Sequence, residues 1–109
     1  MDLRIAGFDW DDGNREKCRG HGVGRSDIEA LFGRPIAVFP SVHAKDEARF
    51  KAIGTNAEGR HIFVVFTLRR RAADTFIRPI GARYMHEKEV SYYEKQTAEA
   101  EKAARPENG

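Results

Sequence analysis

The sequence predicts a small α+β domain, in which two N-terminal helices and one C-terminal helix pack on an antiparallel sheet. Its 109 residues suit a single hydrophobic core. Residues 60–68 are apolar on both strand faces, which is typical of the central strand of a sheet. The predicted order of strand, two helices, strand, three-stranded meander and helix favours helices layered against one sheet.

The first helix is expected after a strand over residues 3–10. Asp11 or Asp12 caps it, because a carboxylate accepts hydrogen bonds from the free amides of the first turn. The helix runs to Arg19 and contains few apolar residues. Its stability must therefore come from docking, mainly of Trp10.

The second helix is expected to begin at a capping box, Ser26-Asp27-Ile28-Glu29. In this motif the serine and glutamate side chains each bind a free backbone amide of the first turn. Gly33 and Pro35 end the helix. Its apolar face consists of Ile28, Leu31 and Phe32.

The remaining strands are expected over four further segments: 37–40, 49–56, 60–68 and 74–80. The last three form the meander. Turn residues Asn56-Ala57-Glu58-Gly59 join its first two strands. The triplet Arg69-Arg70-Arg71 with Ala72-Ala73 is interpreted as the turn between the last two.

The last helix is expected to start near His86, with Glu87 and Glu89 in its first turn. Beyond Lys95 the apolar pattern gives way to Glu, Ala and Lys. The sequence therefore predicts one domain over residues 1–95, followed over 96–109 by an exposed helical extension or a disordered tail.

Composition narrows the functional classes. The formal net charge of +2 is far from that of a histone-like polycation, and 40% hydrophobic residues indicate a globular chain. Cys18 is the only cysteine, so an internal disulfide or a cysteine zinc cluster is excluded. The four histidines lack ligand spacing, and we expect no metal and no cofactor. No apolar run resembles a signal peptide or a membrane span, so a cytoplasmic protein without membrane contact is expected.

Two arginines near the end of the last strand are candidate phosphate ligands, because a guanidinium group stays charged and binds phosphate oxygens bidentately. Side chains alternate along a strand, so Arg78 and Arg83 would lie on opposite faces of a regular strand. Pro79 and Gly81 are residues typical of a bulge. We therefore predict an irregularity between Pro79 and Ala82 that brings both arginines to one face.

The sequence resembles BrnT toxins, RelE-like ribonucleases of type II toxin–antitoxin systems. The likeness rests on four blocks in this order: Phe8-Asp9-Trp10-Asp11 with Asn14, Lys17 and His21-Gly22-Val23; the helix from Ser26 to Phe32 with Pro35; Glu47 to Gly54 running into Gly59-Arg60; and Ile77 to Arg83 with Glu87, Glu89 and Tyr93. Gly81 departs from the serine usual in the family. The arginine triplet and the Glu/Ala/Lys tail are not features of the family pattern.

The resemblance implies a RelE-like fold and a toxin that cleaves mRNA without a metal and thereby inhibits translation. The implied partner is a BrnA-like antitoxin with a ribbon-helix-helix segment, and the complex would bind operator DNA through the antitoxin. The alternative is a degenerate toxin that serves as a non-catalytic nucleic-acid-binding or protein-interaction module, since the sequence has no unmistakable general base.

Metal-free RNA cleavage needs a base for the ribose 2′-hydroxyl, cations for the phosphorane oxygens and an acid for the leaving oxygen. Arg78 and Arg83 are the candidate phosphate ligands, with Arg49 as a third cation and Glu47 as its partner or as the base. His61 is a candidate for proton transfer, because histidine titrates near neutrality. The alternatives are surface ion pairs from the arginines to Glu47 or Glu87, a solvated Glu47 and a purely structural His61.

Six further residues are candidate RNA contacts: Lys17, His21, Arg60, Arg69, Arg70 and Tyr92. Lys17 and His21 lie one helical turn apart and so share a face, although His21 equally suits a helix C-terminus. A basic cluster recruits nucleic acid by counterion release, or else forms a solvated loop. Tyr92 would stack on a base or meet the antitoxin.

Overall fold

The chain folds around one five-stranded sheet with the strand order β1-β5-β4-β3-β2. The computed structural model describes residues 5–41 and 48–104. The strands are β1 (Ile5–Phe8), β2 (Ala37–Pro40), β3 (Arg49–Thr55), β4 (His61–Arg71) and β5 (Asp74–Tyr84). The predicted α+β class is confirmed. The sheet is mixed, because β1 joins the free edge of β5 in parallel while the other pairs are antiparallel.

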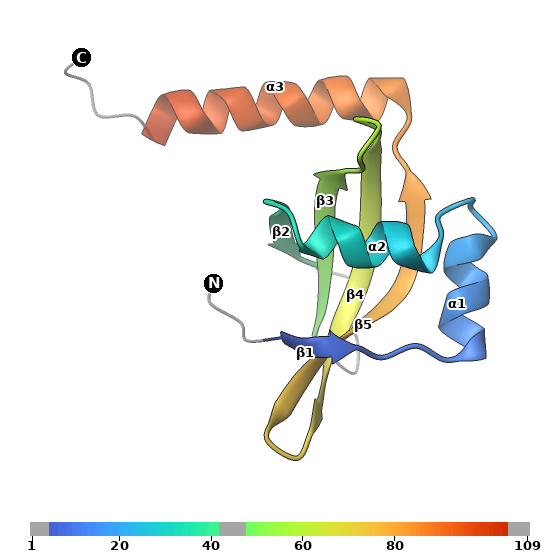
Figure 1. Cartoon of the computed structure of the whole chain (residues 1–109). Helices are drawn as coiled ribbons and strands as arrows, with labels where there is room; N and C mark the ends of the chain where they lie inside the picture. The colour runs from blue at the N-terminus through green and yellow to red at the C-terminus, as the bar shows by residue number, and fades with distance from the viewer. Residues whose placement is uncertain (1–4, 42–47, 105–109) are drawn as a thin grey trace.

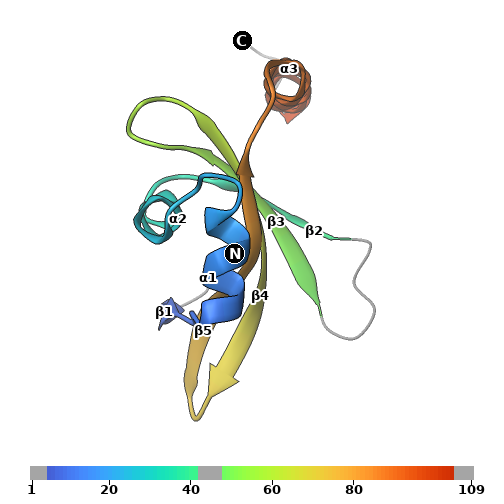
Figure 2. The same cartoon turned by 90° about the vertical axis from the view of Figure 1, so that its right-hand side faces the viewer.

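Three helices accompany the sheet: α1 (Asp12–Arg19), α2 (Arg25–Phe32) and α3 (Glu87–Ala104). Helix α2 crosses one face of the sheet, and α1 packs along β5 (Figure 1). Helix α3 leaves the end of β5 and lies beyond the end of the sheet, away from α1 and α2 (Figure 2). The C-terminal helix therefore meets the sheet only near its own start, among the described residues, and does not cover a face. The sequence analysis had instead expected this helix to pack on the sheet.

The core lies between the sheet and α2. Ile62, Val64 and Phe66 alternate along β4 and are buried, and they face the buried Ile28 and Leu31 of α2. Strand β4 stands in the middle of the sheet order, which confirms the prediction for residues 60–68. The predicted capping of α1 is also confirmed, because Asp11 accepts a hydrogen bond from the amide of Asn14. Trp10 packs against the core and so docks α1 as expected.

The predicted capping box at Ser26 is wrong. Helix α2 begins one residue earlier, at Arg25, and its cap residue Gly24 offers no side chain to the first turn. Glu29 is not available to a serine cap, because its Oε2 accepts a hydrogen bond from Arg25 Nε at 2.9 Å. An ion pair one turn apart on the helix surface thus replaces the reciprocal cap.

The predicted turn at the arginine triplet is wrong as well. Arg69, Arg70 and Arg71 continue the β4 ladder and pair with Phe76, Thr75 and Asp74. The turn consists of Ala72 and Ala73 alone, and Ala72 adopts a left-handed φ of 56°. Backbone pairing in the long β4–β5 hairpin therefore outweighs the poor strand preference expected of three adjacent charges.

Gly54 marks a close approach between β3 and α2. A Cβ atom at this position would lie 2.8 Å from Leu31 Cδ1 and 2.8 Å from Ile36 Cγ2. Leu31 is 1% exposed and has no room to move. We expect Gly54→Ala to destabilise the fold by about 1–3 kcal/mol through overpacking.

Urea unfolding measures this loss. Gly81→Ala is the matched control, because a Cβ atom at Gly81 meets no atom within 4 Å. Equal free energies of unfolding for the two variants would contradict the packing described for Gly54.

Candidate active site

A bulge interrupts β5 at the predicted place. Val65 of β4 pairs with Gly81, and its neighbour Phe66 pairs with Pro79, so Ile80 is the additional residue. The irregularity predicted between Pro79 and Ala82 is confirmed. Two further pairs show its effect: Arg78 lies opposite Thr67 and Arg83 lies opposite Phe63. Since these β4 residues are four positions apart, the two arginines share one face of the sheet.

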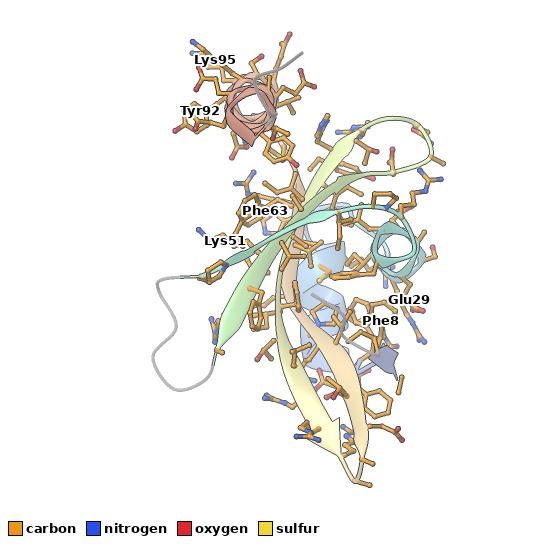
Figure 3. The ribbon with its side chains drawn as sticks, turned by 90° about the vertical axis from the view of Figure 1, so that its left-hand side faces the viewer. Phe8, Glu29, Lys51, Phe63, Tyr92 and Lys95 are labelled. Carbon is orange, nitrogen blue, oxygen red and sulfur yellow. The ribbon has the colours of Figure 1, made fainter. Side chains whose placement is uncertain are left out.

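This face carries most of the positive charge of the three central strands. Arg49 and Lys51 of β3 pair with Thr67 and Val65, which alternate with the core residues of β4. Figure 3 shows Lys51 and Phe63 on one side of the sheet and Phe8 and Glu29 on the other. We call this side the cationic face and define it by six residues: Arg49, Lys51, Arg69, Arg71, Arg78 and Arg83.

Arg78 is held by two carboxylates at the start of α1. Its Nη2 donates to Asp11 Oδ2 at 2.7 Å, and its Nη1 lies 3.5 Å from Asp9 Oδ2. The hydrogen bond to Asp11 raises the pKa of Arg78 above its ordinary value. Asp9 also accepts from Arg71 Nη2 at 3.1 Å, so one carboxylate joins two arginines of the hairpin.

Asn14 connects this acidic loop to the bulge. Its amide Nδ2 donates to the carbonyl of Pro79 at 2.8 Å and to that of Asp9 at 3.0 Å. Its Oδ1 accepts from the backbone amide of Asp11 at 2.7 Å. Asn14 is only 6% exposed, so these three hydrogen bonds satisfy a buried amide. The backbone amide of Asn14 is in turn the largest cause of the lowered pKa of Asp11.

Arg83 is held by the first turn of α3. Its Nη1 and Nη2 each donate to a carboxylate oxygen of Glu89 at 2.7 Å, which is the bidentate geometry that suits a guanidinium group. Glu89 Oε1 also accepts from the backbone amide of His86 at 2.9 Å. The Arg83 hydrogen bond, followed by that of His86, lowers the pKa of Glu89 to about 2 from an ordinary value of 4.5.

This lowered pKa predicts a pH dependence for Glu89→Gln. A carboxyl group with a lowered pKa in the folded state stabilises the fold above its unfolded pKa, and this contribution is lost as the pH falls. We expect wild type to exceed the variant in unfolding free energy at neutral pH, with a gap that closes between pH 4.5 and about 2. Urea unfolding at pH 7, 4 and 2.5 checks this, and a gap that is constant across the three would contradict it.

Two hollows lie beside the bulge. The Arg83 hollow has a volume of about 320 Å³, and its lining comprises Lys17, His21, Arg49, Phe63, Val65, Ile80, Gly81, Ala82 and Arg83. The Arg78 hollow has a volume of about 720 Å³, and its lining comprises Asp11, Asp12, Gly13, Asn14, Lys17, Arg49, Arg78, Pro79 and Ile80. Lys17, Arg49 and Ile80 line both hollows. The two hollows are therefore adjacent and form one continuous surface beside the bulge.

The other predicted site residues are dispersed. His61 lines neither hollow: its Nε2 lies 3.9 Å from Glu94 Oε1, and its ring contacts Tyr93. The Arg60 guanidinium covers the Tyr84 ring at 3.7 Å. Arg69 belongs to the cationic face but lies beyond the bulge, Arg70 lies on the opposite face of the β4–β5 hairpin, and Tyr92 is exposed on α3. Glu47 lies outside the described residues, and the acid that pairs with Arg83 is Glu89 in place of Glu87.

Several residues of this region were not predicted from the sequence. Lys51 follows Arg49 by two positions, and this strand period was the signal that would have placed both on one face. Asp9 and Asp11 were assigned to a strand end and a helix cap, with no role toward Arg78. Asn14 carried no local signal, since its partner Pro79 is 65 positions away in the sequence.

The site can bind an anion and stabilise negative charge. Among the described residues, Lys17 and Arg49 have no carboxylate partner, so both are available to a phosphate group. No group of three metal-ligating side chains occurs in the part of the chain that the structure describes. Burial raises the pKa of the Cys18 thiol, which keeps it protonated and unsuited to nucleophilic attack. No described helix is long and apolar enough to cross a membrane.

An apolar groove of about 560 Å³ lies elsewhere, between α2 and the strands β1–β5. Its lining contains no ionisable side chain: Ile5, Phe32, Ile36, Val38, Phe39, Pro40, Phe50, Phe66, Leu68 and Ile77. A groove without a cation does not fit a phosphate-bearing ligand. The cationic face is therefore the candidate site for an anion.

The comparison with known families agrees with this geometry. Residues 10–89 match the family described as ribonuclease toxin, BrnT, of type II toxin-antitoxin system. Comparison with curated proteins finds no similar sequence. The matched segment covers most of the chain and contains α1, the bulge and both arginines. The chain belongs to the BrnT family of ribonuclease toxins of type II toxin–antitoxin systems.

Proposed function

We propose that the cationic face is the catalytic surface and that it cleaves RNA without a metal ion. The observation that carries this proposal is the bulge at Ile80, which puts Arg78 and Arg83 on one side of the sheet with Arg49. RNA carries a phosphate at every nucleotide, and a row of cations on one face follows such a backbone. The family supplies the reaction class, which is ribonuclease activity.

The proposed step is attack of the ribose 2′-oxygen on the adjacent phosphorus. The 2′-O–H bond breaks as the 2′-O–P bond forms and its proton passes to a general base, and the P–O5′ bond breaks as a general acid donates a proton to the leaving oxygen. The products are a 2′,3′-cyclic phosphate and a 5′-hydroxyl. Negative charge grows on the phosphorane oxygens, and fixed guanidinium groups stabilise it. Arg78 and Arg83 exchange their bonds with Asp11 and Glu89 for bonds with phosphate.

His21 is the imidazole that we propose for proton transfer. It lines the Arg83 hollow with Lys17 and Arg49, whereas His61 is turned to α3. A general base must first lie within hydrogen-bonding distance of the group that it deprotonates, and only then does its pKa matter. We also propose a role for Glu47, either as the partner of Arg49 or as the general base.

We propose that the RNA substrate is mRNA and that its cleavage stops translation in the cytoplasm. The antitoxin that the family implies would be BrnA-like, with a ribbon-helix-helix segment through which the complex meets operator DNA. We assign this function to residues 1–95, because the contacts of α3 with the sheet come from Glu89, Tyr93 and Glu94. Residues 96–109, of which 96–104 continue α3, are outside this assignment.

Cleavage in the presence of EDTA tests the proposal. We expect the purified protein to cut RNA equally with and without a chelator, because the arginines supply the charge stabilisation that a metal ion would otherwise give. The expected ends are 2′,3′-cyclic phosphate and 5′-hydroxyl. Activity that EDTA abolishes and Mg²⁺ restores, or products with 3′-hydroxyl ends, would contradict the mechanism.

A second candidate is a non-catalytic module that binds nucleic acid or protein. The pairing of both arginines with carboxylates favours it, since such pairs also serve as structural ties. It predicts salt-dependent RNA binding with intact RNA after long incubation. The same incubation therefore separates the two candidates.

A further inference from the structure

The Arg83 hollow combines an apolar floor with a cationic rim. The floor contains Phe63, Val65 and Ile80, and the rim contains Lys17, Arg49 and Arg83. A phosphate group needs only the rim and gains nothing from apolar surface. A nucleobase attached to that phosphate would cover the floor, because its flat ring is apolar on both sides.

We propose that the Arg83 hollow is a nucleobase subsite, in which one base of the RNA packs on the floor while its phosphate meets the rim. This inference rests on the proposed function, since it assigns a base to the RNA that the cationic face binds. The volume of about 320 Å³ is at the lower end of the range for small-molecule sites and suits a single ring system.

The bulge explains why the floor is open. Gly81 lies opposite Val65, and a Cβ atom on it would meet no atom within 4 Å. Helix α2 lies on the opposite face of the sheet (Figure 3). Helix α1 contributes Lys17 to the rim, and α3 contacts the rim through Glu89, which binds Arg83, so the floor itself consists of strand residues. The Arg83 guanidinium lies 5.0 Å above the Phe63 ring, so the subsite already contains the cation–aromatic contact common in base recognition.

The geometry at Gly81 gives a sharp test. A Cβ atom at this position would meet no atom within 4 Å, so a leucine side chain would begin in open space and is expected to extend over the floor. Gly81→Leu is therefore expected to keep the fold and the cationic rim while it excludes a base. Gly81→Ala adds only the Cβ atom, and Ala30→Leu adds the same side chain to the exposed surface of α2. Ala30→Leu is the control, and Gly81→Ala is a smaller change at the tested position itself.

The probes are the four nucleoside 5′-monophosphates and ribose 5-phosphate, which has the same phosphate and sugar but no base. For wild type and Ala30→Leu, we expect the preferred nucleotide to bind at least about fivefold tighter than ribose 5-phosphate, as base stacking on aromatic groups contributes in other proteins. In Gly81→Leu this ratio should fall to about one while the affinity for ribose 5-phosphate is unchanged. Titration calorimetry measures both constants, and urea unfolding verifies the fold.

Two results would overturn this inference while leaving the proposed function intact. The first is an affinity ratio of one for wild-type protein that still cleaves RNA. The second is an affinity ratio in Gly81→Leu equal to that of wild type. Gly81→Ala provides the second reading if leucine disturbs the strand, because an intermediate ratio supports the subsite and an unchanged ratio counts against it. Failure of wild type both to bind ribose 5-phosphate and to cleave RNA would instead contradict the proposed function.

Discussion

Replacement of Arg83 or Arg78 by alanine is expected to lower kcat/KM for RNA cleavage by about 10²–10³-fold, the loss typical of removing one preorganised donor to a developing anion. Both guanidinium groups lie on the face that the bulge creates, and both now hold a carboxylate where a phosphate would bind. Lysine at either position should restore little, because an ammonium group cannot reproduce the bidentate geometry. Cleavage of a fluorescent RNA under single-turnover conditions measures the effect.

Arg25→Ala is the matched control for the two arginine variants. Arg25 is an exposed arginine on α2, paired with Glu29 at 2.9 Å, and α2 lies on the face opposite the cations. The same charge is removed there without touching the proposed site, so cleavage should stay within about twofold of wild type, in line with a surface substitution. Full growth arrest on induction of the Arg78→Ala, Arg83→Ala double variant would refute the site assignment.

Asn14→Leu is expected to lower both the stability of the fold and the rate of cleavage. The substitution leaves the carbonyls of Pro79 and Asp9 and the amide of Asp11 without their partner, and unsatisfied buried groups cost about 1–3 kcal/mol each. Partial access of water should reduce the total to about 3 kcal/mol, still a large share of the stability of a small domain. Because Asn14 positions the loop that holds Arg78, we also expect kcat to fall while KM changes little.

A variant of equal stability separates these two effects. Ile28→Ala removes a fully buried side chain from α2 at a typical cost of about 2–5 kcal/mol, without touching the bulge or the acidic loop. At a temperature where both variants remain folded, Ile28→Ala should cleave RNA like wild type and Asn14→Leu should not. Equal rates for the two would mean that Asn14 is only structural.

Sequence patterns within short segments predicted the strands and the bulge. Apolar residues on both faces of β4 predicted its central place, and the Pro79-Ile80-Gly81 segment indicated where β5 would change register. These features depend on residues that are near one another in the chain. Such patterns do not predict which of two possible hydrogen-bond partners a side chain will take. Glu29 pairs with Arg25, so it does not form the reciprocal cap expected with Ser26.

The tertiary contacts of the candidate site had no signal in the sequence. Asn14 and Pro79 meet only because α1 packs along β5, and Asp9 reaches Arg71 for the same reason. The choice of Glu89 over Glu87 as the partner of Arg83 depends on how the first turn of α3 leaves the sheet. The sequence therefore identified the cations but not the carboxylates that hold them.

The central claim is that RNA lies on the cationic face, and amide chemical-shift mapping tests it most directly. A 2′-O-methyl oligoribonucleotide lacks the attacking hydroxyl and so binds without being cleaved. We predict that its addition shifts the amides of Lys51, Phe63 and the bulge at Ile80-Gly81, and the side-chain Nε–H signals of Arg78 and Arg83, while the amides of α2 stay unchanged. Shifts confined to α2 and β2, beside the apolar groove, would contradict the account.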